Sequence, residues 1–348
     1  MRAELFDYEL PEAAIAQRPS AERGGARMLV LGQAFEDAVV SSFAERVPPG
    51  AVVVLNDTRV RHARLHATRA GSSGRVELFL LTPLGEERTR WRALGRANRP
   101  LRPGARLVLP IGHAEVEAKD ADGTLTLRLE GLGEGEALEQ ALAGFGHVPL
   151  PPYVKRPDDV EDAARYQTVF SRVLGSVAAP TAGLHLTEAH LTRLAARGVT
   201  LAFVTLHVGL GTFRPVSTED LDQHPMHAEW VEVPSATAQV VSQAVHDGRQ
   251  VVAVGTTVVR ALESAASPEG VAPFLGETRL LIQPGYRFRA VSSLLTNFHM
   301  PKSTLLALVS ALAGRERLLA AYAHALARGY RFLSYGDAMW IPERLSDG

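Results

Sequence analysis

The sequence predicts an α/β protein with a mainly parallel sheet, helices on both faces of that sheet, and an inserted small antiparallel β-barrel. Two observations predict this class. Short apolar runs alternate with helical patterns over most of the chain, which is typical of buried parallel strands and their crossover helices. Between about 64 and 130 the pattern changes to short period-two runs separated by turn residues, which is typical of half-buried antiparallel strands.

The α/β part shows strands and helices in alternation. A strand is predicted at 51–55, and beyond about residue 151 strand and helix patterns follow each other. Sequential units of this kind build a mainly parallel sheet with helices on its faces. The later predicted strands are 199–206, 250–254 and 278–282, and the predicted helices are 188–197, 235–247, 257–266, 303–313 and 315–328.

The barrel pattern interrupts this alternation. Runs such as RVELFLL and TLTLRLE alternate apolar and polar residues, and turn residues such as those at 71–74 and 122–123 separate them. The strand at 51–55 belongs with the later strands of the sheet. We therefore expect a discontinuous α/β catalytic domain, 1–62 and 150–348, and an inserted barrel domain, 63–149.

Composition narrows the class of protein. A chain of 348 residues with 46% hydrophobic residues can bury a sizeable core. The chain has no cysteine, which excludes a disulfide framework, a thiol nucleophile and a thiolate metal site. The start, MRAELFDYELPEAA, carries acids where a signal peptide needs an apolar core, and no apolar stretch approaches the roughly 20 residues that span a bilayer. We expect a cytoplasmic protein without membrane association.

Charge is unevenly distributed along the chain. The formal net charge is -1, yet residues 59–106 hold twelve arginines against three glutamates, a net +9. A basic face on an otherwise acidic protein is expected of a phosphate-backbone binder. The alternative is compositional, because arginine is the usual cation of a chain with only three lysines. Charge reversal at Arg90 and Arg92 tests the first interpretation.

Five clusters of Gly, Thr, His and Asn lie beside apolar runs. Because the carboxyl ends of parallel strands share one edge, where ligands bind in open α/β sheets, the clusters predict one polar crevice. The clusters are NDTR (56–59), APTAGLHLT (179–187), TLHVGLGTFRP (205–215), GTTVVRALE (255–263) and TNFHMPKST (296–304).

The glycines and threonines of these clusters suit an anion or a carboxylate. Gly255 ends a predicted strand, and Thr256 or Thr257 can cap the next helix, where free N–H groups face the crevice. Ordinary capping explains either threonine equally well. Gly209 and Gly211 permit close backbone approach, but the third glycine of a dinucleotide fingerprint is absent.

Four histidines, at 185, 207, 227 and 299, lie in or beside the clusters. Each is a possible base near neutral pH, although a lone histidine is more often structural. No H-E-x-x-H spacing occurs, and His224 and His227 lack an acidic or thiolate companion, so we predict no catalytic metal. Ser303 beside Lys302 suggests a nucleophile pair, but a helix cap explains Ser303 better.

A whole-chain resemblance adds to these observations. FDYELPEAAIAQRP, VLNDTRV, SVAAPTAGLHLT, FVTLHVGLGTFRPV, MHAEW, VAVGTTVVRALES, TNFHMPKSTLLALVSALAG and YRFLSYGDAM occur in order between Phe6 and Met339. Together they closely resemble the S-adenosylmethionine:tRNA ribosyltransferase-isomerase family of queuosine biosynthesis. The departures are Leu186 for the usual Phe, Arg61-His62 for an Ile-Pro-like pair, and Met300 for Leu.

The resemblance implies an α/β domain with an inserted barrel and a transferase/isomerase activity in tRNA modification. The ribosyl part of S-adenosylmethionine is transferred and isomerised onto 7-aminomethyl-7-deazaguanine at the wobble position of tRNA, giving epoxyqueuosine-tRNA, adenine and methionine. S-adenosylmethionine is consumed as a co-substrate, so no cofactor is expected, and we expect a monomer. The sulfonium acidifies the adjacent ribosyl methylene, which calls for a positioned base in a dry pocket and for no protein nucleophile.

The candidate catalytic and binding residues come from the five clusters named above. His207 and His185 are the candidates for proton transfer, Asp57 is the acidic partner, and Arg59 is a clamp on tRNA phosphate or substrate. We expect the nucleoside and methionyl parts to lie against the backbone of one set of residues: Thr181, Gly183, Gly209, Gly211 and Thr256. Asn297, His299 and Lys302 form the opposite wall and orient the deazaguanine.

Two other classes stay open on these residues. A methyltransferase uses the same sulfonium donor but releases S-adenosylhomocysteine instead of adenine and methionine. A noncatalytic RNA-binding protein fits the basic barrel but leaves the polar clusters at strand ends unexplained.

Overall fold

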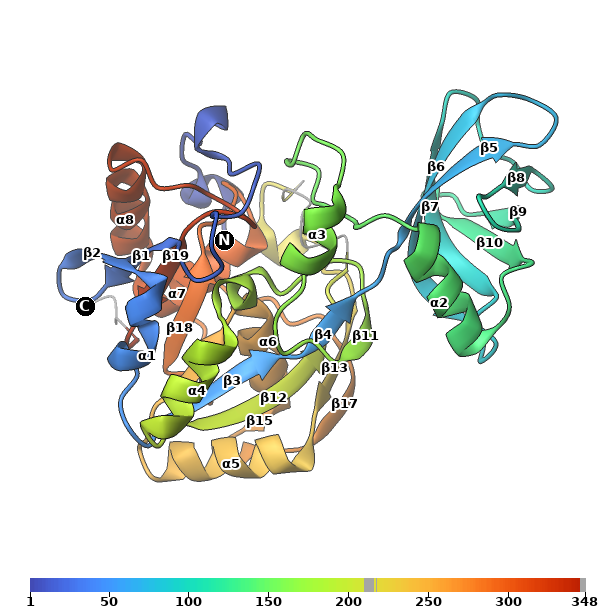
Figure 1. Ribbon diagram of the computed structural model, residues 1–348. Helices are drawn as coiled ribbons and strands as arrows, with labels where there is room; N and C mark the ends of the chain where they lie inside the picture. The colour runs from blue at the N-terminus through green and yellow to red at the C-terminus, as the bar shows by residue number, and fades with distance from the viewer. Residues whose placement is uncertain (210–215, 217, 345–348) are drawn as a thin grey trace.

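The computed structural model describes residues 1–209, 216 and 218–344. A nine-stranded sheet with helices and a separate closed barrel make up the chain (Figure 1). The strand order of the sheet is β17 (Phe274–Thr278), β13 (Glu229–Val233), β12 (Thr200–Leu206), β3 (Val52–Asn56), β14 (Val251–Val254), β18 (Ser293–Asn297), β19 (Ala338–Ile341), β1 (Arg27–Leu31) and β2 (Phe35–Val39).

The centre of the sheet is parallel, as predicted. β3 pairs in parallel with β12 and β14, and β14 pairs in parallel with β18. β3 and β14 are buried along their whole length, because helices cover both faces of the sheet. The outer strands are mostly antiparallel: β13 with β12, β17 with β13, β19 with β18 and β2 with β1. β1 and β19 are parallel.

Helices cover both faces, which confirms the predicted fold class. One core cluster packs the sheet against α5 (Ser235–His246), α6 (Thr256–Ala265), α7 (Thr304–Ala313) and α8 (Arg315–Ala327). A second cluster packs the other face against α1 (Phe43–Arg46) and α4 (Glu188–Ala196). Short elements complete this part: α3 (Val160–Arg165), β15 (Ala266–Ser267), β16 (Gly270–Val271) and the two-stranded pair of β4 (Thr58–Val60) and β11 (Val173–Ser176).

Two local predictions are wrong. The strand expected at 278–282 is instead β17, 274–278, because its register opposite β13 uses the residues before the apolar run, while Ile282 fills the core outside any strand. Neither Thr256 nor Thr257 caps α6, since Gly255 is the N-cap at φ +94°. Thr257 Oγ1 instead accepts from Asn56 Nδ2 at 3.2 Å. Ser303 does cap α7, accepting from the Leu306 N–H at 3.2 Å.

The barrel closes in the order β10 (Leu125–Glu130), β7 (Arg90–Ala97), β6 (Arg75–Leu84), β5 (Arg64–Arg69), β8 (Arg106–Val108) and β9 (His113–Lys119). Alternate residues point inward around Trp91, and α2 (Gly135–Phe145) packs Leu138 and Leu142 against the same core. Figure 1 shows the barrel standing beside the sheet, joined to it through β4. The domain limits at 62/63 and 149/150 stay a prediction.

Across the part of the chain described, no helix is both long and apolar enough to cross a bilayer.

Candidate active site

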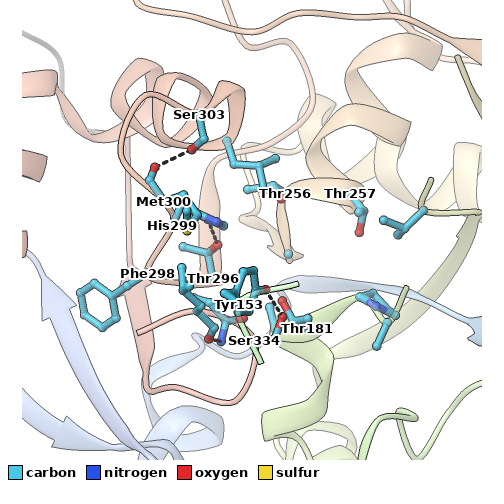
Figure 2. A pocket seen from close by; sticks show the side chains of 18 residues that line it. Tyr153, Thr181, Thr256, Thr257, Thr296, Phe298, His299, Met300, Ser303 and Ser334 are labelled. Carbon is cyan, nitrogen blue, oxygen red and sulfur yellow. Dashed lines mark hydrogen bonds between the residues drawn. The ribbon is translucent and has the colours of Figure 1, made fainter. Parts of the chain in front are cut away.

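A narrow pocket lies at the carboxyl edge of the sheet. Its walls come from the segments that follow β14 and β18 and from the 3-10 helix Thr181–His185. The labelled residues in Figure 2 belong to it: Tyr153, Thr181, Thr256, Thr257, Thr296, Phe298, His299, Met300, Ser303 and Ser334. Val208, which follows β12, also lines it, so four of the five predicted clusters meet here, as expected of parallel strands that share one edge. We name this cavity the inner pocket.

Asn297 is held in one orientation within the inner pocket. Its Nδ2 lies 3.1 Å from His185 Nε2 and donates to the Leu333 carbonyl at 3.1 Å. Because a carbonyl only accepts, the Leu333 contact fixes Nδ2 on that side. His185 is buried, and this burial lowers its pKa to about 4, so its Nε2 is neutral and accepts from Asn297. His185 itself supports Asn297 from behind and is not part of the pocket lining.

His299 lines the inner pocket as a neutral ring. Its Nε2 lies 2.9 Å from Thr296 Oγ1 (Figure 2), and burial lowers its pKa to about 4. The backbone at His299 is fixed on both sides, since the Tyr322 hydroxyl lies 2.8 Å from its N–H and the Tyr8 hydroxyl donates to its carbonyl at 2.5 Å. This wall is therefore rigid.

A wider cleft lies between the barrel and the sheet. It has a volume of about 670 Å³, and residues of both parts line it, among them Pro83 and Arg92 from the barrel and His207 and Trp230 from the sheet. We name it the barrel cleft. Val208 lines both this cleft and the inner pocket, so the two cavities adjoin each other.

His207 lines the barrel cleft, as does a second histidine, His227. The His207 ring stacks on Trp230 with centroids 4.9 Å apart, and its Nδ1 lies 2.8 Å from Thr58 Oγ1. Burial lowers the pKa of His207 to about 4, the positive charge of Arg61 acts in the same direction, and Asp57 opposes both. Thr58 engages Nδ1, and in the tautomer in which Nδ1–H donates to the Thr58 hydroxyl the other nitrogen, Nε2, is free to accept a proton.

Glycine at position 175 makes room for the His207 ring, whose Nε2 edge packs close to the backbone there. A Cβ atom on Gly175 would lie only 2.3 Å from His207 Nε2. The backbone there is not in the left-handed region, so steric space alone requires glycine.

Asp57 lies behind His207 and does not contact it. One carboxylate oxygen accepts from Thr205 Oγ1 at 2.6 Å, and the other accepts from Arg172 Nη2 at 2.9 Å. Asp57 therefore influences His207 through its charge and through the adjacent Thr58. The direct partner of the ring is Thr58, which the sequence alone did not single out.

The remaining predicted residues divide into those at the site and those away from it. Thr181 and Thr256 line the inner pocket, and Gly209 lines the barrel cleft. Gly183 is buried against Phe170 and Thr168. Lys302 Nζ pairs with Asp7 at 2.8 Å on the surface.

Arg59 is exposed on β4, on the strand that leads toward the barrel. Gly211 lies outside the described residues.

Arg61 is a further cleft residue that sequence reasoning passed over. It is 4% exposed, binds Glu139 of α2 through Nε at 2.8 Å and Nη2 at 2.7 Å, and lies over the Trp91 ring at 4.8 Å. The sequence does contain a signal for this residue, because Arg61 stands where the resembling family has an apolar residue. The pair ties the strand leading out of the sheet to the barrel helix.

The barrel charge differs from the sequence expectation. Over 63–149, twelve basic residues face eleven acidic ones, a net of +1. Arg90 pairs with Glu117 at 2.7 Å and Arg92 with Asp120 at 2.5 Å. The arginines for which we find no ion pair among the described residues, Arg69, Arg75, Arg96, Arg99 and Arg102, lie where β5 ends, β6 begins and β7 ends. We name these five residues the basic rim.

Within the residues described, no group of three or more His, Asp or Glu side chains could hold a metal ion. The polar groups of the inner pocket are instead a neutral histidine, an amide, hydroxyls and backbone, and the barrel cleft adds neutral His207 and charged side chains such as Arg61, Arg92 and Glu229. Such a set binds and orients an organic substrate and moves protons.

The fold and the site define an α/β protein with a small-molecule pocket that adjoins a barrel-lined cleft at one sheet edge. The sequence profile described as "Queuosine biosynthesis protein" matches residues 3–341. A Sorangium cellulosum protein named S-adenosylmethionine:tRNA ribosyltransferase-isomerase is 53% identical, covering 98% of each chain. A Magnetococcus marinus protein of the same name is 49% identical, covering 99% of this chain and 95% of that one.

A solved structure agrees with these relatives. The crystal structure of a Thermotoga maritima S-adenosylmethionine tRNA ribosyltransferase matches with a TM-score of 0.54 and 32% identity, covering 97% of this chain and 99% of that chain. The chain belongs to the queuosine biosynthesis protein family.

Proposed function

We propose that the protein is an S-adenosylmethionine:tRNA ribosyltransferase-isomerase. It transfers and isomerises the ribosyl part of S-adenosylmethionine onto 7-aminomethyl-7-deazaguanine at the wobble position of tRNA, releasing adenine and methionine and leaving epoxyqueuosine-tRNA. The relatives that carry this name match along their whole length. The observation that carries the proposal is the junction at Val208, where a pocket fit for a nucleoside meets a cleft open to a larger substrate.

The two cavities divide the substrates between them. The inner pocket takes the nucleoside of the donor, because hydroxyls and an amide converge there on an apolar surface. The barrel cleft takes the deazaguanine, which can stack near Trp230 and His207 as flipped bases do on aromatic side chains. The transferred sugar then crosses at Val208, close to His207.

His207 Nε2 is the base in this proposal. It removes a proton from the ribosyl methylene beside the sulfonium, and the electron pair left on carbon opens the sugar as the bond to adenine breaks. Ring opening leaves a vinyl sulfonium and, once adenine has departed, an aldehyde at the carbon that held it. The amine of the deazaguanine adds to the vinyl carbon and loses a proton, and the carbon beside sulfur then bonds to the aldehyde carbon and closes the carbocycle. The resulting alkoxide displaces the sulfur, which forms the epoxide and releases methionine as a neutral thioether. A base with a pKa of about 4 is unprotonated across the neutral range, so it enters the reaction ready to accept.

We further propose that no resident cofactor takes part, since S-adenosylmethionine supplies the transferred group. A monomeric, cytoplasmic protein remains our expectation. Arg59 and the basic rim are proposed to contact tRNA phosphates.

Product analysis tests the function. The protein is incubated with S-adenosylmethionine and tRNA carrying the aminomethyl deazaguanine, and the small molecules are separated by chromatography. We expect adenine and methionine in equal amounts. S-adenosylhomocysteine would indicate methyl transfer, and an unchanged donor despite tight RNA binding would indicate a noncatalytic binding protein.

A further inference from the structure

A third cavity continues the inner pocket along the groove between α6 and α7. Arg260 lies one helical turn after Thr256 on the same face of α6, and it lines this third cavity while Thr256 lines the inner pocket. On α7, Leu305 lines both cavities. The two cavities therefore adjoin at Leu305, which places Arg260 within the direction in which an extended ligand of the inner pocket would continue. We name the third cavity the arginine pocket.

Arg260 has an unused donor. The residue is 6% exposed, its Nη1 donates to Glu229, and its Nε donates to the Leu280 carbonyl at 3.1 Å. Nη2 is buried and makes no hydrogen bond within the described part of the chain. A guanidinium is always charged, and a buried charged donor without an acceptor is costly. An oxygen acceptor that enters the arginine pocket would satisfy it.

Glu229 gives the arginine pocket a second charge. Its carboxylate is buried beside Arg260, and one oxygen also accepts from the Gly209 N–H at 3.1 Å. A phosphate or sulfate would gain from Arg260 but would be repelled by Glu229. A group that carries both an anionic and a cationic end is complementary to the pair, and the head of an α-amino acid is such a group.

We propose that the arginine pocket binds the amino-acid head of the sulfonium donor, with its carboxylate accepting from Arg260 Nη2 and its ammonium on the Glu229 side. The inference rests on the proposed function and deepens it. It places the methionyl arm between α6 and α7 and the nucleoside at their N-terminal ends. The same contacts hold the methionine product, whose head group is unchanged by the reaction.

The test compares two donors in two proteins. Wild type and Arg260→Met are each assayed for adenine release with S-adenosylmethionine and with its decarboxylated analogue, which keeps the sulfonium, the nucleoside and the amine. We expect the wild type to prefer the carboxylated donor by about 10- to 100-fold in kcat/KM, the size of a charge-assisted hydrogen bond. In Arg260→Met this preference should fall to within about threefold.

The ratio of the two donors is measured within one preparation, so the fraction of folded protein cancels. Arg260→Lys keeps the charge but loses Nη2, and we expect an intermediate preference. The matched control is Arg193→Met, which removes an arginine from a surface pair with Glu45 and should leave the wild-type preference unchanged.

An undiminished preference in Arg260→Met, or none in the wild type, would overturn the inference while adenine release still supports the proposed function. Absence of adenine from the wild type with either donor would instead overturn both.

Discussion

At the scale of single residues, the site depends on histidines that burial keeps neutral. His185 and His299 hold the inner pocket, and His207 faces the barrel cleft; each has a pKa lowered to about 4, first by burial. His207 lines the barrel cleft, and its Nε2 makes no hydrogen bond among the described residues. The two other rings have one nitrogen engaged with Asn297 or Thr296 and serve to fix the walls.

His207→Ala should reduce kcat by about 10²-fold or more, because it removes the proposed general base. The measurement is steady-state adenine release with circular dichroism to verify folding. Near-normal turnover in a folded His207→Ala protein would mean that another group removes the proton.

The buried histidines also predict how stability depends on pH. Their folded-state pKa lies below the unfolded value of about 6.5, so the unfolded chain binds more protons between pH 6.5 and 4. Stability is therefore complete above pH 6.5 and falls on acidification. Between pH 7 and 5 we expect a loss of about 2 kcal/mol in the free energy of unfolding for each of His185 and His299.

Urea denaturation at pH 7 and pH 5 measures this loss. His299→Gln should reduce the difference in the free energy of unfolding between pH 7 and pH 5 by the contribution of one histidine. Replacement of the exposed His113 with Gln should leave that difference unchanged. An equal pH dependence in wild type and His299→Gln would contradict the burial argument.

At the scale of elements, β11 determines whether His207 can act. Gly175 lies on this short strand next to His207 Nε2. The backbone conformation of Gly175 suits alanine, but an added Cβ would collide with the His207 ring. Gly175→Ala should displace the ring and lower kcat by about 10²-fold, comparable to loss of the base. Gly144→Ala on α2, where an added Cβ meets nothing within 4 Å, is the control and should be neutral. Wild-type turnover in Gly175→Ala would show that the position of the His207 ring next to Gly175 does not matter for catalysis.

The sequence predicted helices and strands well where a single pattern of apolar residues runs through the whole element. The fully apolar run of β3 and the amphipathic pattern of α5 are each found within one residue of the predicted start. β17 was displaced, because its apolar continuation fills the core and pairing with β13 sets the register. Pairing partners depend on tertiary packing and have no local signal.

The convergence of the clusters could be predicted because the carboxyl ends of parallel strands share one edge of the sheet. The contacts between individual residues could not be predicted in this way. Asn297 meets His185 across 112 residues of sequence. The Thr58 contact to His207 joins residues 149 apart in sequence, and the role of Arg61 depends on how the barrel helix α2 docks. Lys302, adjacent in sequence to pocket residues, points instead to Asp7 because its backbone at φ +50° turns it outward.

At the scale of the whole molecule, a buried ion pair connects the sheet to the barrel. Arg61→Met leaves Glu139 buried with Arg88 at 3.6 Å as its remaining cation, and we expect a loss of about 3–5 kcal/mol in the free energy of unfolding. The double variant Arg61→Met/Glu139→Met removes both charges and should recover most of the loss. Chemical denaturation measures both. Equal stability of the single and double variants would show that the charges are not coupled.

The surface charge of the barrel gives a second prediction at this scale. Replacing Arg75 and Arg99 of the basic rim with Glu should weaken tRNA binding and flatten its dependence on salt, since both side chains are exposed and free of ion pairs among the described residues. The matched reversal at Arg90 and Arg128, which are both paired with Glu117 and do not line the barrel cleft, should have a smaller effect. Filter binding across a salt series distinguishes them, and equal effects would show that the basic rim is not the contact surface.

A structure of the ternary complex tests most directly that the inner pocket and the barrel cleft form one active site. The complex contains the anticodon stem-loop with its aminomethyl deazaguanine and an unreactive thioether analogue of the donor. We predict the analogue between α6 and α7, the deazaguanine beside Trp230, and the ribosyl methylene within about 3.5 Å of His207 Nε2. A donor bound away from the Val208 junction, or a deazaguanine outside the barrel cleft, would contradict it.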